Sequence, residues 1–257
     1  MKIAFVWYWD RASEILPNWR DGLRAAVEII ERDHQVDWYL DKKLPNPHDY
    51  DFILVWDDSN TRVVDLLGQH DTRMGICLTT DPNNLTNLSN FDVVYCESDP
   101  IFEDVRKHGL HAIKAFGTDT NFFTPDDTEK DIEYFYPATF SPWKNQKEIA
   151  HLGSKLLCLG TLQPDGQEEL DACQANGVQL KVGYYPAEEI RDLYRRSKKV
   201  IIPAVHGSER TVLEAKAMGI PIETTASTNS KVLSLLDKDI KDFTSEKYAE
   251  ALLKGMK

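Results

Sequence analysis

The stretch KVIIPAVHGSERTVLEAKAMGIPI, residues 199–222, carries the pattern that decides the fold. Its apolar opening predicts a buried strand over residues 199–203, and the apolar positions of residues 210–218 recur at helical spacing. A second stretch of strand length follows at residues 221–224. A strand, a helix and a second strand in this order are typical of a βαβ unit in a parallel sheet.

The same alternation continues on both sides of this stretch. A first series predicts strands at residues 3–7, 36–40, 52–56, 75–78 and 91–96, with helices at 19–30, 62–68 and 99–108. A second series predicts strands at 132–137, 155–160, 178–182, 199–203 and 221–224, with helices at 146–152, 167–175, 187–196 and 210–218. Between the two series, residues 116–127 contain many breakers, which predicts a linker. Residues 245–253 predict a closing helix that packs back across both domains.

The composition is that of a globular chain with a sizeable core, because 42% of the 257 residues are hydrophobic and 28% are charged. The apolar runs are far shorter than the ~20 residues that span a bilayer. The N-terminus has no basic and then apolar leader, so we expect a cytoplasmic protein without a transmembrane segment. The four cysteines form no CxxC pair, and we expect them to be reduced and mostly buried.

The formal net charge of −12 is distributed unevenly along the chain. Residues 1–125 hold 12 basic and 21 acidic side chains, whereas residues 126–257 hold 18 and 21. An acidic first half would repel a phosphate backbone, which disfavours nucleic acid as a partner without excluding it. A solvated acidic enzyme surface is the simpler interpretation of the same charge.

Several common site motifs are missing from the sequence. It has no G-x-G-x-x-G, Walker loop or G-x-S-x-G elbow, so a dehydrogenase, a nucleoside triphosphatase and an α/β-hydrolase have no local support. Residues 49–51 and 237–239 match a DxD metal motif by letter. The first precedes a predicted strand and the second lies in the tail, so we expect no metal site at either.

The loop before the helix at residues 210–218 is a candidate anion site. A helix start carries unsatisfied N–H groups and the positive end of the dipole, and both favour negative charge. Gly207 lets a ligand approach the backbone closely, and the Glu214 carboxylate could accept hydrogen bonds from the paired hydroxyls of a ribose. In the alternative interpretation, Ser208 is only an N-cap and Glu214 is a solvated helix residue.

This stretch resembles the donor-site signature of the retaining GT-B glycosyltransferases of the family-4 type (glycosyl transferases group 1), as in EGFGLVLLEAMACGTPV. Residues 98–125, SDPIFEDVRKHGLHAIKAFGTDTNFFTP, are similar to the family's strand, helix and strand leading into GVDxxxFxP. Residues 138–146, ATFSPWKNQ, resemble its GRxxxxKG loop, and residues 183–194, GYYPAEEIRDLY, resemble GxVPxxELxxLY. The four segments follow the family's order and span about half of the chain.

The resemblance implies an α/β chain with the GT-B fold, in a compact and divergent form. Two Rossmann-like parallel-sheet domains would face a cleft, since such sheets bind ligands at the carboxyl ends of their strands. Residues 1–119 would form an acceptor domain, residues 120–243 the nucleotide-sugar donor domain, and residues 244–257 the closing helix.

Three positions depart from the family's pattern. At the position of the first glutamate of the family's donor motif, eight residues before Glu214, this chain has His206. Where the family has an arginine in the phosphate loop, this chain has Thr139, which leaves Lys144 as the matching cation. Where the family often has a histidine in the first domain, this chain has Thr80. A diphosphate needs several donors, so the resemblance implies a cradle of Lys144 with the amides at the helix start. The implied donor-binding residues are Thr139, Lys144, Tyr184, Gly207, Ser208, Glu209, Arg210 and Glu214.

The implied reaction moves a sugar from a nucleotide diphosphate sugar, a UDP- or GDP-sugar, to an acceptor hydroxyl. The resemblance implies a hexosyltransferase-type enzyme that retains the anomeric configuration and uses neither a metal nor a tightly bound cofactor. Lys144 would stabilise the departing diphosphate, with Glu214 and His206 as the other catalytic residues. His206 would hydrogen-bond the donor sugar in place of the missing carboxylate, or it is a loop histidine without a role. The acceptor would be a carbohydrate, a lipid-linked molecule or a small molecule.

Two other functions stay open at this point. A catalytically degenerate nucleotide-sugar-binding protein would explain the missing glutamate and arginine. A glycosyltransferase that acts on a modified base in viral DNA would need a basic groove, for which Arg11, Arg20 and Arg24 are candidates. Further side chains that could face a ligand are Trp7, Tyr8, Trp9, Asp10, Asp57, Asp58 and Trp143, although Trp7 fits a core position better.

Overall fold

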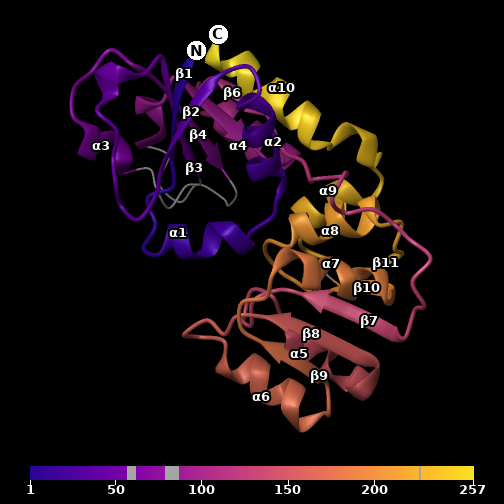
Figure 1. Ribbon diagram of the computed structural model, residues 1–257. Coiled ribbons are helices and arrows are strands. Elements are labelled where there is room, and N and C mark those ends of the chain that lie inside the picture. The colour runs from indigo at the N-terminus through magenta and orange to yellow at the C-terminus, as the bar shows by residue number, and fades with distance from the viewer. Residues whose placement is uncertain (57–61, 79–86, 226) are drawn as a thin grey trace. The chain divides into compact units, whose positions relative to one another are not determined.

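The chain forms two compact units, one of Met1–Gly117 with Asp242–Lys257 and one of Thr118–Lys241. The computed structural model describes residues 1–56, 62–78, 87–225 and 227–257 (Figure 1). Asp57 and Asp58, which the sequence marks as candidate ligand contacts, and Thr80, which stands in place of the family's histidine, lie outside the described residues. Among the described residues, no helix is both long enough and apolar enough to cross a membrane.

The first unit contains a six-stranded parallel sheet with the strand order β2-β1-β3-β4-β5-β6. The strands are β1 (Lys2–Val6), β2 (Gln35–Tyr39), β3 (Phe52–Trp56), β4 (Arg73–Leu78), β5 (Val93–Cys96) and β6 (Ala112–Lys114). Strands β1 and β3 to β5 are almost wholly buried, which is why they read as continuous apolar runs rather than alternating ones. The predicted parallel sheet is confirmed.

The helices predicted at residues 19–30, 62–68 and 99–108 are each shorter in the structure, whereas the C-terminal helix extends three residues beyond its predicted end and a short helix at residues 12–15 was not predicted. The helices of the first unit are α1 (Ala12–Ile15), α2 (Gly22–Ile30), α3 (Val63–Leu67), α4 (Asp99–Lys107) and α10 (Ser245–Met256). The helix expected from residue 19 begins at Gly22, because the Asp21 carboxylate accepts a hydrogen bond from the Arg24 N–H and caps the helix there. Residues before this cap form the short turn Leu16–Asn18 with Pro17 at its start.

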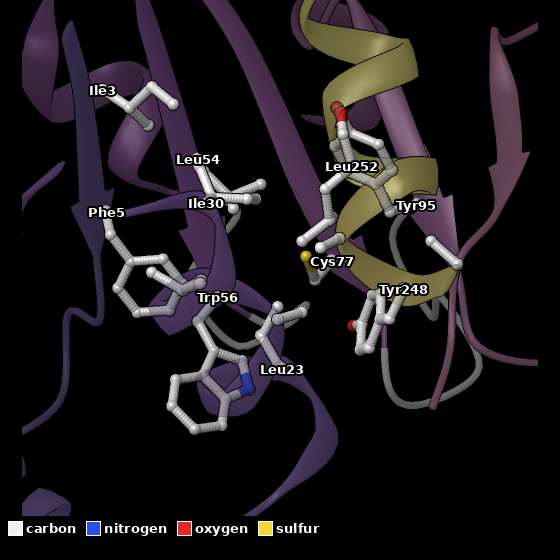
Figure 2. Packing of buried hydrophobic residues seen from close by; sticks show 14 of the residues in the cluster. Ile3, Phe5, Leu23, Ile30, Leu54, Trp56, Cys77, Tyr95, Tyr248 and Leu252 are labelled. Atoms are coloured by element: carbon white, nitrogen blue, oxygen red, sulfur yellow. The ribbon is translucent and has the colours of Figure 1, made fainter. Parts of the chain in front are cut away.

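The C-terminal helix α10 belongs to the first unit although it follows the second in sequence. Figure 1 shows it in yellow beside α2, and Figure 2 shows Tyr248 and Leu252 packed near Cys77 and Tyr95. The Tyr95 hydroxyl donates a hydrogen bond of 2.7 Å to the Leu252 carbonyl. At Gly255 a Cβ would lie 2.5 Å from this hydroxyl, so only glycine lets the helix approach so closely. Packing of α10 across both domains stays a prediction.

Replacing Leu252 with alanine is expected to destabilise the first unit. The Leu252 side chain is fully buried in the cluster that α10 forms with α2 and the sheet. Deleting a buried leucine leaves a cavity and costs about 2–5 kcal/mol of unfolding free energy. Urea denaturation followed by circular dichroism measures the loss, with the exposed Leu233→Ala in the second unit as the control. Equal stability of Leu252→Ala and the unmodified protein would contradict this packing.

The second unit contains a five-stranded parallel sheet with the order β11-β10-β7-β8-β9. Its strands are β7 (Ile132–Pro137), β8 (Leu156–Gly160), β9 (Gln179–Val182), β10 (Ser197–Ile202) and β11 (Ile222–Thr224). Its helices are α5 (Gln146–Ile149), α6 (Gln167–Ala175), α7 (Ala187–Arg195), α8 (Glu209–Ala217) and α9 (Ser230–Leu236). The sequence prediction lacked α9, whose N-cap Asn229 accepts from the Val232 N–H.

The strand order of the second sheet brings two loops together. Strands β7 and β10 are parallel neighbours, with Phe135 opposite Val200. Their carboxyl ends therefore lie side by side, and the loops that follow them, residues 138–145 and 203–208, leave the sheet at adjacent points. Ligands of such sheets bind at the carboxyl ends of neighbouring strands.

All four cysteines, Cys77, Cys96, Cys158 and Cys173, are buried free thiols, as expected. Burial raises the pKa of the Cys96 thiol to about 12, which leaves it protonated and unreactive near neutral pH.

Candidate ligand site at the carboxyl ends of β7 and β10

The loop at residues 138–145 is fixed by hydrogen bonds at both of its ends. The fully buried Gln146 donates from Nε2 to the Thr139 carbonyl at 2.7 Å. The Tyr136 hydroxyl donates to the Lys144 carbonyl at 3.1 Å, and the Lys144 N–H donates to the Ser141 carbonyl at 2.9 Å. These bonds fix the backbone at Lys144, the cation that the family resemblance implies for a diphosphate.

The loop at residues 203–208 is tied to the first loop and to α9. The N–H groups of Val205 and His206 both donate to the Trp143 carbonyl, at 3.0 and 3.2 Å. The buried Asn229 side chain donates to the carbonyls of Ala204 and Gly207, at 3.0 and 2.9 Å. Two loops from neighbouring strands and one helix start thus form a single hydrogen-bonded cluster.

The loop ends in two residues with left-handed backbone conformation, Gly207 with a φ of 74° and Ser208 with a φ of 75°. A Cβ at position 207 would collide with the Lys144 ammonium, which therefore lies directly against the glycine backbone. The Lys144 Nζ donates to the His206 carbonyl at 3.2 Å and to the Ser208 Oγ at 3.3 Å. The structure thus brings Lys144, His206, Gly207 and Ser208 together.

Helix α8 starts at this cluster. Ser208 is its N-cap residue, but within the described part of the chain the serine side chain makes no capping hydrogen bond to the helix. Ser208 therefore occupies the N-cap position without the side-chain cap of the alternative interpretation, and its hydroxyl lies against Tyr136 and Lys144 instead. The first N–H groups of a helix have no acceptor within the helix itself, and together with the dipole they favour an anion.

The Glu209 side chain is buried below the start of α8. Its Oε1 lies 3.8 Å from the Nζ of Lys231 on α9, and both side chains are almost wholly buried. A buried charge is tolerated when it is paired, so this ion pair explains how the carboxylate is accommodated at the helix start. The carboxylate also faces the cluster, because its Oε2 lies 3.9 Å from the position of a Cβ on Gly207, the same position that the Lys144 ammonium approaches.

Glu214 lies further along α8 and is not a solvated residue. Its carboxylate is buried and accepts a hydrogen bond of 2.8 Å from the Tyr194 hydroxyl. The Tyr194 ring packs edge-on against Phe123 and Phe135. Burial is the main cause that raises the pKa of Tyr194, so its hydroxyl stays protonated and donates to Glu214.

The side chains of His206, Arg210 and Tyr184 have different surroundings. The His206 and Trp143 rings meet edge to face with centroids 6.4 Å apart. Arg210 lies in the first turn of α8 and is partly exposed. Tyr184 follows β9 and is 74% exposed. Because β9 is separated from β7 by β8, the strand order does not place Tyr184 next to Lys144.

The sequence analysis did not identify two residues of the cluster, Tyr136 and Asn229. Asn229 follows a small-residue run and precedes an apolar helical stretch, which is an N-cap signal that would have predicted α9. Tyr136 gives no such signal, because a tyrosine within an apolar run is typical of any buried strand.

The candidate residues of the first unit have other partners. Trp7 is buried in the core, as expected, whereas Trp9 is 49% exposed. The three arginines proposed for a basic groove are all ion-paired: Arg11 with Glu14, and both Arg20 and Arg24 with Glu28. Across residues 1–56, 62–78, 87–225 and 227–257, no cluster of three or more His, Cys, Asp or Glu side chains could hold a metal ion.

Comparison with solved structures identifies the fold. The glycosyltransferase AviGT4, involved in avilamycin A biosynthesis, superposes with a TM-score of 0.68 at 15% identity, over 99% of this chain and 96% of that one. The trehalose-6-phosphate synthase OtsA gives a TM-score of 0.69 at 8% identity, over 100% and 99% of the two chains. A UDP-GlcNAc 2-epimerase from Methanocaldococcus jannaschii gives 0.53 at 11%, over 99% of both chains.

The chain therefore has the GT-B fold, with two Rossmann-like parallel-sheet domains, as the sequence resemblance implied. At these identities the likeness concerns the fold, which hosts both transferases and an epimerase. No protein-family model matches the chain, and no curated protein matches its sequence.

Proposed function

We propose that the chain is a retaining, metal-independent glycosyltransferase that moves a sugar from a UDP- or GDP-sugar to an acceptor hydroxyl. The observation that carries the proposal is the Lys144 ammonium lying against Gly207 at the start of α8. A cation, close access to the backbone and the N–H groups of a helix start are what a diphosphate leaving group requires. The fold of AviGT4 and OtsA supports the same reaction class.

The residues take distinct roles in this proposal. Lys144 and the amides of Ser208 and Glu209 stabilise the negative charge that develops on the diphosphate as the bond to the sugar breaks. Arg210, in the same first turn, adds a second cation. Glu214 binds the ribose hydroxyls through its carboxylate, which Tyr194 orients. His206 faces the sugar, and Thr139, in the same loop as Lys144, completes the donor site.

The acceptor in this proposal is a carbohydrate, a lipid-linked molecule or a small molecule. The ion pairs of Arg11, Arg20 and Arg24 with glutamates favour it over DNA, because paired arginines add little positive potential. The excess of acidic over basic side chains in residues 1–125 also disfavours DNA as the acceptor.

A thermal-shift panel of UDP, GDP, TDP and their sugars tests the donor site. A ligand at 100 times its Kd stabilises a protein by about 2.7 kcal/mol, so we expect a shift of several degrees with the nucleotides of one base. Hits are then followed for nucleotide release without acceptor, and slow hydrolysis is expected because water can replace the acceptor hydroxyl.

The outcomes of this panel separate the possible functions. A shift with slow hydrolysis supports the transferase and identifies the base. A shift without hydrolysis, or with conversion of the sugar and no nucleotide release, favours a binding protein or an epimerase instead. No shift with any nucleotide would overturn the proposed donor site.

A further inference from the structure

The buried Tyr136 hydroxyl touches both loops of the candidate site. Tyr136 is the last residue but one of β7, and it is fully buried. Its hydroxyl lies 3.1 Å from the Lys144 carbonyl in one loop and 3.1 Å from the Ser208 Oγ in the other. The Tyr136 hydroxyl therefore contacts both Lys144, which carries the cation, and Ser208, the N-cap residue of α8.

The direction of these hydrogen bonds follows from the atoms involved. A carbonyl oxygen only accepts, so Tyr136 donates its single proton to the Lys144 carbonyl. The contact with Ser208 then requires the serine hydroxyl to donate to the Tyr136 oxygen. Burial raises the pKa of Tyr136, which keeps the phenol protonated and the direction unchanged near neutral pH.

The Lys144 ammonium completes a closed ring of hydrogen bonds. Its Nζ donates to the Ser208 Oγ at 3.3 Å, the Ser208 hydroxyl donates to Tyr136, and Tyr136 donates back to the Lys144 carbonyl. The end of the lysine side chain is thereby fixed relative to its own backbone. Ser208 has a left-handed backbone instead of the extended one from which a serine caps a helix, and its Oγ accepts from the Lys144 ammonium instead of from a helical N–H.

We propose that Tyr136 is the positioning residue of the diphosphate site, because its hydroxyl holds the Lys144 ammonium and the start of α8 in the geometry that binds the anion. This inference rests on the proposed function for the class of ligand. Tyr136 acts through Lys144 and Ser208, since a fully buried hydroxyl does not reach the ligand itself. A tyrosine that only filled the core would need its ring and not its hydroxyl.

The test measures binding of inorganic pyrophosphate, UDP and GDP by isothermal titration calorimetry to Tyr136→Phe, Ser208→Ala and the double variant. Tyr136→Phe keeps the ring, and Ser208→Ala removes the partner hydroxyl from the loop side should the phenylalanine variant fold poorly. Tyr134→Phe is the matched control, because Tyr134 lies two residues earlier on β7 and its ring contacts Lys199 instead of the site. Thermal unfolding without ligand confirms that each variant is folded.

We expect each single variant to weaken pyrophosphate binding at least fivefold and Tyr134→Phe to bind as the unmodified protein does. The double variant is expected to lose less than the product of the two single losses, because both substitutions open the same ring. Unchanged affinity of Tyr136→Phe, or losses that multiply independently, would overturn the positioning role while leaving the proposed function intact. If the unmodified protein binds neither pyrophosphate nor any nucleoside diphosphate, the proposed function fails, and this inference fails with it.

Discussion

Lys144→Ala is expected to lower the affinity for the nucleotide donor, or its turnover, at least tenfold. The ammonium lies against Gly207 and between the His206 carbonyl and the Ser208 hydroxyl, at the start of α8. Hydrogen bonds between charged groups contribute about 1.5–3 kcal/mol each, and 1.4 kcal/mol corresponds to a factor of ten. Titration calorimetry with the nucleoside diphosphate measures the affinity, and release of the nucleotide measures the turnover.

Lys198→Ala is the control for this variant. Lys198 lies near the start of β10, at the opposite end of the strand from the site, and its ammonium pairs with Glu133 at 2.8 Å. Loss of a surface ion pair changes stability by about 0–1 kcal/mol and is expected to leave donor binding unchanged. Equal donor binding by Lys144→Ala and Lys198→Ala would remove Lys144 from the site.

Glu214→Ala is expected to lower both the affinity for the donor and the stability of the fold. It removes the carboxylate proposed to bind the ribose, which would lower donor affinity at least tenfold. It also leaves the buried Tyr194 hydroxyl without the acceptor that lies 2.8 Å away, which costs about 1–3 kcal/mol of stability. Calorimetry and urea denaturation measure the two effects separately.

Tyr194→Phe distinguishes the binding role of Glu214 from its structural role. This variant removes the same hydrogen bond from the other side but keeps the carboxylate. We expect Tyr194→Phe to lower donor affinity less than Glu214→Ala does. If Glu214→Ala is destabilised yet binds the donor normally, the carboxylate serves the core of the unit and not the ligand.

The central strands of both sheets were largely predictable because they are almost wholly buried. Continuous apolar runs located β1, β3, β7 and β8 to within a residue or two, and the linker composition separated the two series. The short edge strand β6 was implied only by the family resemblance, and helices α1 and α9 were missing from the prediction. Short elements provide few periodic positions, so their signal was weaker than that of their neighbours.

The candidate site was predictable only where residues close in sequence compose it. Gly207, Ser208 and Glu209 follow directly from a strand, loop and helix pattern, and the cation at Lys144 came from a family resemblance. The ring through Tyr136 joins residues 72 positions apart, and it exists because β7 and β10 are neighbours in the sheet. Strand order is not encoded by local periodicity, so the partners of Tyr136 and of Glu214 could be assigned only from the structure.

The most direct test of the site compares nucleoside diphosphates with their parent nucleosides. Titration calorimetry is carried out with UDP, GDP and TDP and with uridine, guanosine and thymidine, on the unmodified protein and on Lys144→Ala. We predict that one diphosphate binds at least tenfold more tightly than its own nucleoside, and that Lys144→Ala removes most of this difference. A nucleoside that binds as tightly as its diphosphate, or a preference that survives in Lys144→Ala, would contradict a diphosphate site at the start of α8.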